Sequence, residues 1–368
     1  MSVLPASGVI SLARGIPAAD LLPLERLAEG SRRAIERHGR VALNYGPPQG
    51  FGPLCEWIAD RHGVRPERVV VTPGSLIGMG FLVRALVEPG ARVLVEAPTY
   101  DRMLHLLREA RAEIVPDPFA GPARLLYVMP TFHNPTGRSA TLEQRERLAD
   151  AAVEQGLTVV EDDPYGLVRL DGEPLPSVCE LLRARGADEL AVFMSSFSKS
   201  VAPGLRVGYL VLPERLVAPV RALATATYVS PPLLPQAQLF EFLAAGELEP
   251  HLEHVRRRLR PRRDAMLETL DAAMPAGAEW SRPEGGYFLW LELPGDDAAE
   301  LLPRARAAGV DFVPGSGFGG GAGSARLAFS YATADEIRTG VARLGALTAR
   351  TSPPSTRRPD PSAPRTPG

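Results

Sequence analysis

Apolar and polar positions follow two different periods between about residue 68 and residue 212. Short runs rich in β-branched residues predict buried strands at 68–72, 91–96, 124–129, 157–161, 189–195 and 207–212. Between them, apolar positions recur every three or four residues, which predicts helices at 76–87, 100–113, 142–155 and 178–185. This alternation is typical of the α/β class, in which a mainly parallel sheet lies between helices.

The pattern changes after the Pro231-Pro232 pair. A long charged helix is predicted at 252–274, then a strand at 287–293, a helix, two short strands and a last helix at 333–347, which together indicate a smaller α+β domain. The end of the chain holds six prolines among serine, threonine and arginine and is expected to be disordered, because such a composition cannot bury a core. We therefore divide the chain into an N-terminal segment (1–40), a large domain (41–235), a small domain (236–350) and a tail (351–368).

Composition narrows the function classes. The chain has 368 residues, which favours two domains because single cores seldom grow beyond about 250–300 residues. A net charge of −2 gives no basic excess, so neither nucleic acid nor a membrane is expected as a partner. The two cysteines, Cys55 and Cys179, indicate neither a disulfide framework nor a metal site. No signal peptide is recognised, and the apolar stretch at 77–87 is too short to span a bilayer, so we expect a cytoplasmic enzyme or binding protein.

Lysine use is the most informative feature of the composition. Of 41 lysine and arginine side chains only one is a lysine, Lys199. Codon bias in a GC-rich genome explains the abundance of arginine, and a lysine left by chance on the surface is the simple alternative. An arginine guanidinium stays protonated, whereas a lysine amine in a suitable environment loses its proton and attacks a carbonyl to form a Schiff base. Lys199 is therefore a candidate nucleophile.

Three turns that follow predicted strands carry further candidate groups. The segment 72–76 (TPGSL) opens a helix, where glycine allows close approach of a ligand and free amides favour a phosphate. The segment 133–137 (HNPTG) contains Asn134, one of two asparagines in the chain. The segment 161–165 (EDDPY) places carboxylates at the end of a strand, where α/β sheets bind ligands. Taken singly, each has a simpler interpretation as a helix cap, a turn or a solvated loop.

Ser196, Ser198 and Arg206 lie close to Lys199 in the sequence and together suit a phosphate. With them, the chain resembles the fold-type I pyridoxal-phosphate (PLP) enzymes, specifically the class I/II aminotransferases. It is most similar to their aminoadipate-type and aromatic subgroup, which also resembles the catalytic half of certain fused bacterial transcription regulators. The resemblance covers roughly residues 10–348 and rests on 45–50 (YGPPQG), 72–76, 98–100 (PTY), 134–137, 162–165, 196–209 and 326–327 (RL). Its most specific part is the signature S-x-S-K-x-x-x-P-G-x-R-x-G at 196–208.

The resemblance implies three catalytic residues. Lys199 would bond to PLP as an aldimine and carry the proton between substrate and cofactor. Asp162 would pair with the pyridine nitrogen and keep it protonated, so that the ring accepts electrons. Tyr165, together with Asn134, would hydrogen-bond the phenolic oxygen of the cofactor. The implied fold is a large domain with a mainly parallel sheet between helices plus a smaller α+β domain.

The remaining matches imply binding contacts. Tyr100 would stack on the cofactor ring. Arg326 would clamp the α-carboxylate of the substrate, with Asn134 and Gly15 beside it. Tyr45 would reach the phosphate from the neighbouring subunit, which implies a homodimer. Within one subunit, the phosphate contacts are implied for Gly74, Ser75, Leu76, Ser196, Ser198 and Arg206.

The expected reaction is transfer of the α-amino group of an amino acid to a 2-oxo acid. Two alternatives stay open on the residues alone. A PLP-dependent lyase, cyclase or oxidase uses the same scaffold, because the reaction depends on how the substrate is placed. A cofactor-binding transcription regulator needs a DNA-binding domain ahead of Tyr45, and the preceding residues carry neither a helix-turn-helix pattern nor a basic patch.

Four positions depart from the pattern of the subgroup. Leu76 stands where a polar residue is frequent, so a side-chain contact to the phosphate is expected to be missing. His133 replaces the usual glutamine and either lines the site or fills space. Arg14 either binds a distal carboxylate of the substrate or faces solvent. Leu167 stands where relatives often carry glutamate, and nothing in the sequence explains it.

Three other patterns have simple structural interpretations. The segment 315–320 fits G-x-G-x-x-G, but a strand is predicted after it where a dinucleotide site needs a helix. His251 and His254 share a helix face without a third ligand, so a solvated face is expected rather than a metal site. Phe288 and Trp290 alternate as in a strand and are expected in the core of the small domain.

Overall fold

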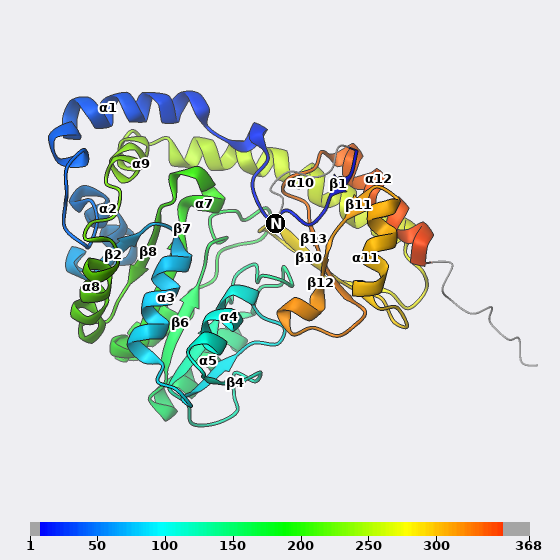
Figure 1. Ribbon diagram of the computed structural model, residues 1–368, viewed down its shortest axis with the longest axis horizontal. Coiled ribbons are helices and arrows are strands. Elements are labelled where there is room, and N and C mark those ends of the chain that lie inside the picture. Colours follow the sequence, from blue (N-terminus) through cyan, green and yellow to red (C-terminus); the bar gives the residue numbers. More distant parts are fainter. Residues whose placement is uncertain (1–7, 349–368) are drawn as a thin grey trace, which may run out of the picture.

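The computed structural model describes residues 8–348, and the predicted tail at 351–368 lies outside them. The larger part is built on strands β2 (Val69–Thr72), β3 (Arg92–Val95), β4 (Glu113–Val115), β5 (Leu125–Val128), β6 (Thr158–Asp162), β7 (Ala191–Ser196) and β8 (Gly208–Val211) (Figure 1). They form a seven-stranded sheet in the order β2-β8-β7-β6-β5-β3-β4. Neighbours are parallel except at β8, which is antiparallel to both β2 and β7. The mainly parallel sheet expected from the sequence is confirmed.

Both faces of this sheet are buried under helices. One face is covered by α3 (Ser75–Leu86), α4 (Asp101–Glu109) and α8 (Glu214–Tyr228), and the other by α2 (Gly52–His62), α5 (Leu142–Gln155) and α6 (Val178–Ala184). Alternate residues of β2 divide between the two hydrophobic clusters, with Val70 in one and Val69 and Val71 in the other. The strands read as continuous apolar runs for this reason.

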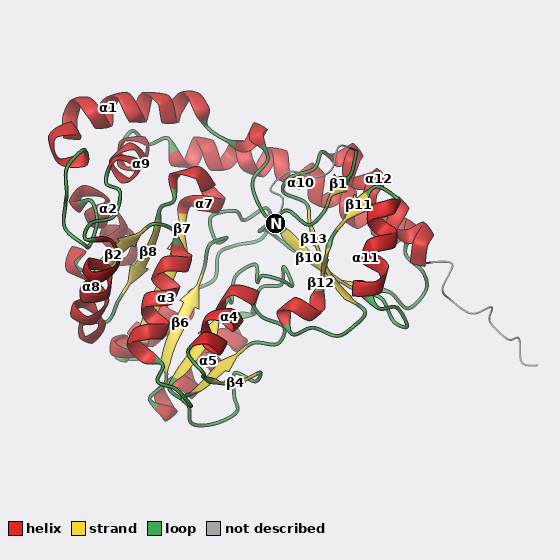
Figure 2. Ribbon diagram, in the orientation of Figure 1, coloured by secondary structure: helices red, strands yellow, loops and turns green. Residues whose placement is uncertain are grey.

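The smaller part contains an antiparallel sheet of β9 (Glu279–Trp280), β10 (Phe288–Glu292), β12 (Val313–Pro314) and β13 (Ser324–Ala328), in the order β12-β13-β10-β9. It carries α11 (Ala298–Ala307), α12 (Ala334–Thr348) and the long α10 (Leu248–Ala273). Figure 2 shows the two sheets as separate groups of strands, with α10 running between the two parts. The second, smaller α+β unit expected from the sequence is therefore present.

The N-terminal segment joins the smaller part. Strand β1 (Ile10–Ser11) pairs in parallel with β11 (Val310–Asp311), and the chain then leads into α1 (Leu24–Ala42), which packs on α9 (Leu234–Ala244). Residues between β1 and α1 therefore pass between the two sheets. The domain boundaries predicted at residues 40 and 235 fall inside α1 and α9. The division into domains at those points stays a prediction.

Several elements differ from the sequence-based expectation. The helix predicted at 100–113 ends at Glu109, because the chain turns at Arg111 with a φ of 57° and continues as edge strand β4. Helices α1, α2, α8 and α9 are not among the predicted elements. Within residues 8–348, no helix has the length and apolar character needed to cross a membrane.

Candidate active site

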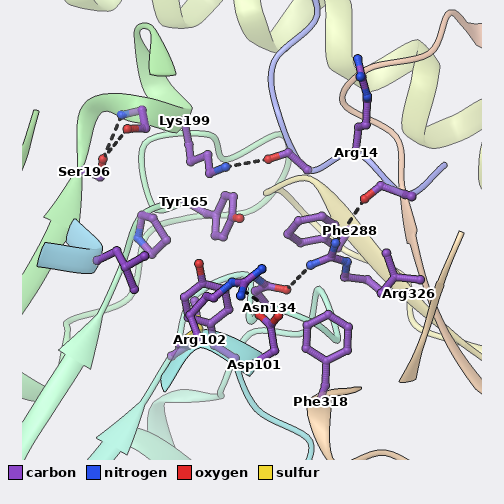
Figure 3. Close-up of a pocket in the computed structure, with 18 of the residues that line it drawn as sticks. Arg14, Asp101, Arg102, Asn134, Tyr165, Ser196, Lys199, Phe288, Phe318 and Arg326 are labelled. Carbon is purple, nitrogen blue, oxygen red and sulfur yellow. Dashed lines mark hydrogen bonds and ion pairs between the residues drawn. The ribbon is translucent and has the colours of Figure 1, made fainter. Parts of the chain in front are cut away.

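A cavity of about 930 Å³ lies between the C-terminal ends of β6 and β7, the small sheet and the N-terminal segment. Figure 3 shows labelled side chains from these regions around the cavity, with that of Arg14 in the N-terminal segment extending away from Lys199. Most of the residues singled out in the sequence line this cavity, namely Gly15, Ser75, Leu76, Tyr100, Asn134, Asp162, Tyr165, Ser196, Ser198, Lys199, Arg206 and Arg326. Gly74 lies just behind its wall, and Tyr45 lies elsewhere.

Lys199 is carried by α7 (Phe197–Ser200), a single short turn that follows β7. Its Nζ donates a hydrogen bond of 2.6 Å to the carbonyl of Gly15, which ties the N-terminal segment to the amine (Figure 3). Burial lowers the pKa of Lys199 to about 8, and the positive charges of Arg326 and Arg206 act in the same direction. A share of the amine is therefore neutral, and nucleophilic, near neutral pH.

Asp162 is the last residue of β6 and is buried. Tyr127 donates a hydrogen bond of 2.8 Å to its Oδ2, while Oδ1 has no partner within residues 8–348. Burial raises the pKa of Asp162 to about 7, against the lowering effect of the Tyr127 hydrogen bond. A buried carboxylate with one free acceptor in a cavity suits a protonated ring nitrogen, because such a partner would satisfy both its lone pair and its charge.

Asp163, the neighbouring acid, makes different contacts. Oδ1 of Asp163 accepts backbone hydrogen bonds from Gly166 at 2.6 Å and from Tyr165 at 3.3 Å, so this carboxylate shapes the turn after β6. The sequence pair Asp162-Asp163 does not by itself distinguish these roles. The distinction appears only in the contacts that each carboxylate makes in the folded chain.

Backbone amides and polar side chains form one end of the cavity. Gly74, with a φ of 90°, precedes α3, and a β-carbon there would lie 2.1 Å from a guanidinium nitrogen of Arg206. Arg206 is held against this turn by a 3.3 Å hydrogen bond to the Pro73 carbonyl. Ser196 Oγ donates to Ser198 Oγ at 2.8 Å. Helix amides, two hydroxyls and a guanidinium thus meet where an anion would bind.

Arg326, on β13, occupies the opposite end. It donates hydrogen bonds to Oδ1 of Asn134 at 2.9 Å and to the carbonyl of Ala13 at 3.2 Å. Its guanidinium carbon lies 4.1 Å from the ring centre of Phe288 and 4.9 Å from that of Phe318. Burial lowers the pKa of Arg326, yet arginine stays charged, so this end presents a desolvated, oriented cation to a carboxylate.

Two tyrosines complete the walls. Tyr165 is buried, with its ring 5.5 Å from Tyr287 and 5.7 Å from Phe288. Tyr100 precedes α4, and burial raises its pKa to about 12, so its hydroxyl stays protonated and can donate. Together they give the cavity flat aromatic surfaces beside Asp162, which suit a planar heterocycle.

The model of the family described as aminotransferase class I and II matches residues 7–344. The chain belongs to this family. The 2-aminoadipate transaminase of Thermus thermophilus is 40% identical over 92% of this chain and 89% of its own length. Aromatic-amino-acid aminotransferase 1 of Thermococcus litoralis is 31% identical over 94% of this chain and 89% of its own. The crystal structure of LysN, the α-aminoadipate aminotransferase of Thermus thermophilus complexed with N-(5′-phosphopyridoxyl)-L-leucine, superposes with a TM-score of 0.88 at 35% identity, covering 94% of this chain and 93% of its own. The resemblance inferred from the motifs is confirmed.

Tyr45 does not line the cavity of this aminotransferase. Tyr45 is 83% exposed and lies at a second hollow of about 380 Å³, lined by residues 42–45 and 230–234. Leu43 in the same hollow is exposed too, as is Val229, which directly precedes residues 230–234. Tyr45 is therefore an outward-facing tyrosine among exposed apolar residues.

The departures from the family pattern have separate structural explanations. His133 is buried beside the cavity wall, with Nδ1 2.9 Å from Thr136 Oγ1 and Nε2 3.4 Å from Glu96, so it braces the loop that carries Asn134. Leu76 is partly exposed at the cavity, and Leu167 packs at the edge of the core.

Arg14 and the paired histidines are also explained by their contacts. Arg14 lines the cavity, but its side chain extends away from Lys199 and lies 4.8 Å from the ring centre of Tyr331 (Figure 3). His251 is buried, with Nε2 2.9 Å from the carbonyl of Ser200 at the end of α7, so the expected solvated face is wrong for this residue. Within residues 8–348, no cluster of histidine, cysteine and acidic residues suits a metal ion.

Several residues in or behind the cavity wall of the aminotransferase are not predicted from the sequence. Phe288, expected only in a core, also forms the cavity wall behind Arg326, and Phe318 joins it from the glycine-rich segment 315–320. Tyr127 and Tyr287 reach Asp162 and the Lys199 backbone from distant segments. Isolated aromatic residues in strands give no local signal for such contacts.

Proposed function

We propose that this protein is a PLP-dependent aminotransferase that transfers the α-amino group of an amino acid to a 2-oxo acid. One observation carries the proposal. The same cavity contains the desolvated amine of Lys199 and a carboxylate oxygen, Asp162 Oδ1, that has no hydrogen-bond partner within residues 8–348. The anion-binding end at Ser196, Ser198 and Arg206 supports the same assignment.

The residues present fit the cofactor group by group. Asp162 Oδ1 would accept a hydrogen bond from the protonated pyridine nitrogen, and Tyr100 would cover a face of the ring. Tyr165 and Asn134 would hydrogen-bond the phenolic oxygen. The phosphate would be held by the amides and side chains of Gly74, Ser75, Leu76, Ser196, Ser198 and Arg206. When bound, PLP supplies an aldehyde that condenses with amines and a ring that accepts electrons.

Lys199 would do two things. Its amine, with a pKa of about 8, would hold the cofactor covalently until the amino group of a substrate displaces it. Once released, Nζ would take the proton from the substrate Cα and deliver it to the cofactor side. Burial serves both tasks, since it keeps a share of the amine neutral and excludes water from the proton being moved.

Arg326 would bind the α-carboxylate of the substrate. In the structure it donates hydrogen bonds to Asn134 Oδ1 and to a backbone carbonyl of the N-terminal segment. A bound carboxylate would either replace these acceptors or lie beside them. Stacking between Phe288 and Phe318 fixes the plane of the guanidinium. An oriented clamp of this kind fixes the Cα–H bond relative to the base.

The active assembly is proposed to be a homodimer in which Tyr45 of one subunit reaches the phosphate in the other. The exposure of Tyr45, and its place outside the cavity of its own chain, support this arrangement. Neither nucleic acid nor a membrane is proposed as a partner, and a cytoplasmic location stays a prediction from the sequence.

A spectral screen tests the proposal. The protein is loaded with PLP, and each amino acid is added singly, with 2-aminoadipate and the aromatic amino acids first because relatives are named for them. Loss of the visible absorbance band, followed by its return on adding a 2-oxo acid, is expected for a donor. Borohydride reduction is expected to leave the pyridoxyl group on Lys199 alone, since the chain has no other lysine. A label elsewhere, or none, would refute the assignment.

The same screen separates amino transfer from the alternative reactions. An aminotransferase stops after one equivalent of amino acid unless an oxo acid is supplied. Continued turnover without an acceptor, with release of ammonia or consumption of oxygen, would instead identify a PLP-dependent lyase, cyclase or oxidase.

A further inference from the structure

The turn that carries Lys199 is too short to stabilise its own end. Helix α7 spans only Phe197–Ser200, and the backbone bonds that close it, from Val201 at 2.9 Å and Ala202 at 3.1 Å, both go to the carbonyl of Phe197. The carbonyls of Lys199 and Ser200 are therefore left at the C-terminal end of a helix, where their hydrogen-bond donors must come from outside it.

Two side chains from the C-terminal half supply those donors. The hydroxyl of Tyr287 donates a hydrogen bond of 2.5 Å to the carbonyl of Lys199. Nε2 of His251, on α10, lies 2.9 Å from the carbonyl of Ser200 and donates to it, because a carbonyl can only accept. Consecutive carbonyls of the lysine turn are thus held by residues 88 and 51 positions away in the sequence.

Both donors are fixed in place. Tyr287 is 1% exposed, its carbonyl accepts the backbone N–H of Phe329 at 3.0 Å, and its ring lies 5.5 Å from that of Tyr165. The same ring lies 5.9 Å from the Lys199 amine. His251 is 3% exposed and its ring meets Phe242 edge-on. Burial raises the pKa of Tyr287 and lowers the pKa of His251 to about 4, so both stay neutral.

We propose that Tyr287 and His251 are positioning residues for Lys199, which fix the backbone of α7 and so aim the amine within the cavity. The inference rests on the proposed chemistry at Lys199. An amine that must first bond to a cofactor and then carry a proton has to return to the same place, and a misplacement of about 1 Å can cost on the order of 100-fold in rate. The Tyr287 hydroxyl and the His251 imidazole bond to backbone carbonyls and not to the amine, so both groups act through the lysine turn.

The decisive variant is Tyr287→Phe, which keeps the ring and removes the hydroxyl. We expect it to bind pyridoxamine 5′-phosphate, which has no aldehyde and cannot bond to Lys199, with wild-type affinity. We expect the rate at which PLP bonds to Lys199, followed by the visible absorbance band, to fall about 10- to 100-fold. With a donor found in the screen, kcat should fall by a similar factor while KM changes by less than about threefold.

His251 provides a second, independent test. His251→Leu removes the donor and is expected to slow bonding of PLP in the same way, whereas His251→Gln keeps an N–H donor and is expected to restore much of the rate. Thermal unfolding of each variant establishes that it is folded before the rates are compared.

Matched controls come from the same chain. Tyr228→Phe removes a buried hydroxyl that has no partner within residues 8–348. His254→Leu removes a histidine of the same helix that bonds to the carbonyl of Asp20. Both controls should bond PLP at the wild-type rate.

Three outcomes would overturn the inference. They are a wild-type rate in Tyr287→Phe and His251→Leu, equal losses of rate in the controls, and a parallel loss of affinity for pyridoxamine phosphate. Failure of the wild-type protein itself to bond PLP would refute the proposed function instead.

Discussion

The hydroxyl of Tyr127 donates a 2.8 Å hydrogen bond to Oδ2 of Asp162, and it thereby leaves Oδ1 as the one carboxylate oxygen free for a ligand. The two residues lie on adjacent parallel strands, β5 and β6, whose register pairs Tyr127 with Val160. Tyr127 is fully buried, so water does not compete for its hydroxyl. The strand register thus orients the acid before any cofactor binds.

This buried acid predicts how the stability of the cofactor-free protein depends on pH. The pKa of Asp162 is raised from 3.8 to about 7 by burial, so between those values the folded state holds a proton that the unfolded state has lost. Its contribution to stability is present below about pH 4 and is lost as the pH rises toward about 7. Asp162→Asn should reduce this loss, as measured by urea unfolding across the range.

Two neighbours limit the size of that change. Burial also raises the pKa of Glu161 to about 7 and that of Asp163 to about 6, so the variant should keep part of the pH dependence. Adding PLP to the wild-type protein should reduce the dependence too, because the ring nitrogen pairs with the charged acid. Identical pH profiles for wild type and Asp162→Asn would contradict the assignment.

Gly74→Ala should weaken cofactor binding specifically. The new methyl group would lie 2.1 Å from a guanidinium nitrogen of Arg206, at a φ of 90° that L residues rarely adopt. Displacing Arg206 and straining the turn should cost about 1–3 kcal/mol, or roughly 10- to 100-fold in PLP affinity measured by spectral titration. Gly80→Ala is the control, since a methyl group there meets no heavy atom within 4 Å. Unchanged affinity in Gly74→Ala would count against the phosphate site.

Arg326→Lys should impair recognition of the α-carboxylate. Lysine keeps the charge but loses the forked geometry that is stacked between Phe288 and Phe318. A lost charged hydrogen bond is worth about 1.5–3 kcal/mol, so kcat/KM for amino acids should fall about 10- to 100-fold. Primary amines that lack a carboxylate serve as the comparison. Equal losses for amines and amino acids would show that Arg326 does not read the carboxylate.

Arg14→Gln should separate the two interpretations of that residue. Arg14 is a cation at the cavity wall beside the segment that bonds to Lys199 and Arg326. If it binds a distal carboxylate, kcat/KM should fall roughly tenfold for dicarboxylic donors and stay unchanged for monocarboxylic ones. Because the side chain extends away from Lys199 and lies over the ring of Tyr331 (Figure 3), we expect no such selective loss. Uniform rates across donors would assign Arg14 to packing on Tyr331.

Mixing two inactive variants tests the contribution of Tyr45 across subunits. Lys199→Ala removes the amine, and Tyr45→Ala removes the proposed contact from the partner. In a mixed dimer, one site would combine an intact Lys199 with an intact Tyr45, so refolding the two variants together should restore activity that neither has alone. Separately refolded variants, combined afterwards, are the control. No gain on mixing would place Tyr45 outside the site.

Much of the candidate site could be predicted from the sequence because of where ligands bind in α/β folds. Gly74, Asn134, Asp162 and Lys199 each lie at the end of a buried strand or in the turn beyond it, and such ends meet at one edge of the sheet. The single lysine also indicates the chemistry, because arginine cannot replace a lysine amine as a nucleophile. These residues are predictable because function constrains their type and the strand pattern constrains their place.

The sequence by itself determined the α/β class and predicted the cofactor-binding motifs and the nucleophile, because strand periodicity and residue chemistry are local properties of a chain. Only the tertiary structure decided that Asp162 rather than Asp163 has the free oxygen, that Phe288 and Phe318 enclose Arg326, and that Tyr287 and His251 hold the lysine turn. Those contacts join segments far apart in the chain, and their geometry depends on strand register and on packing between the two sheets, which no local pattern encodes.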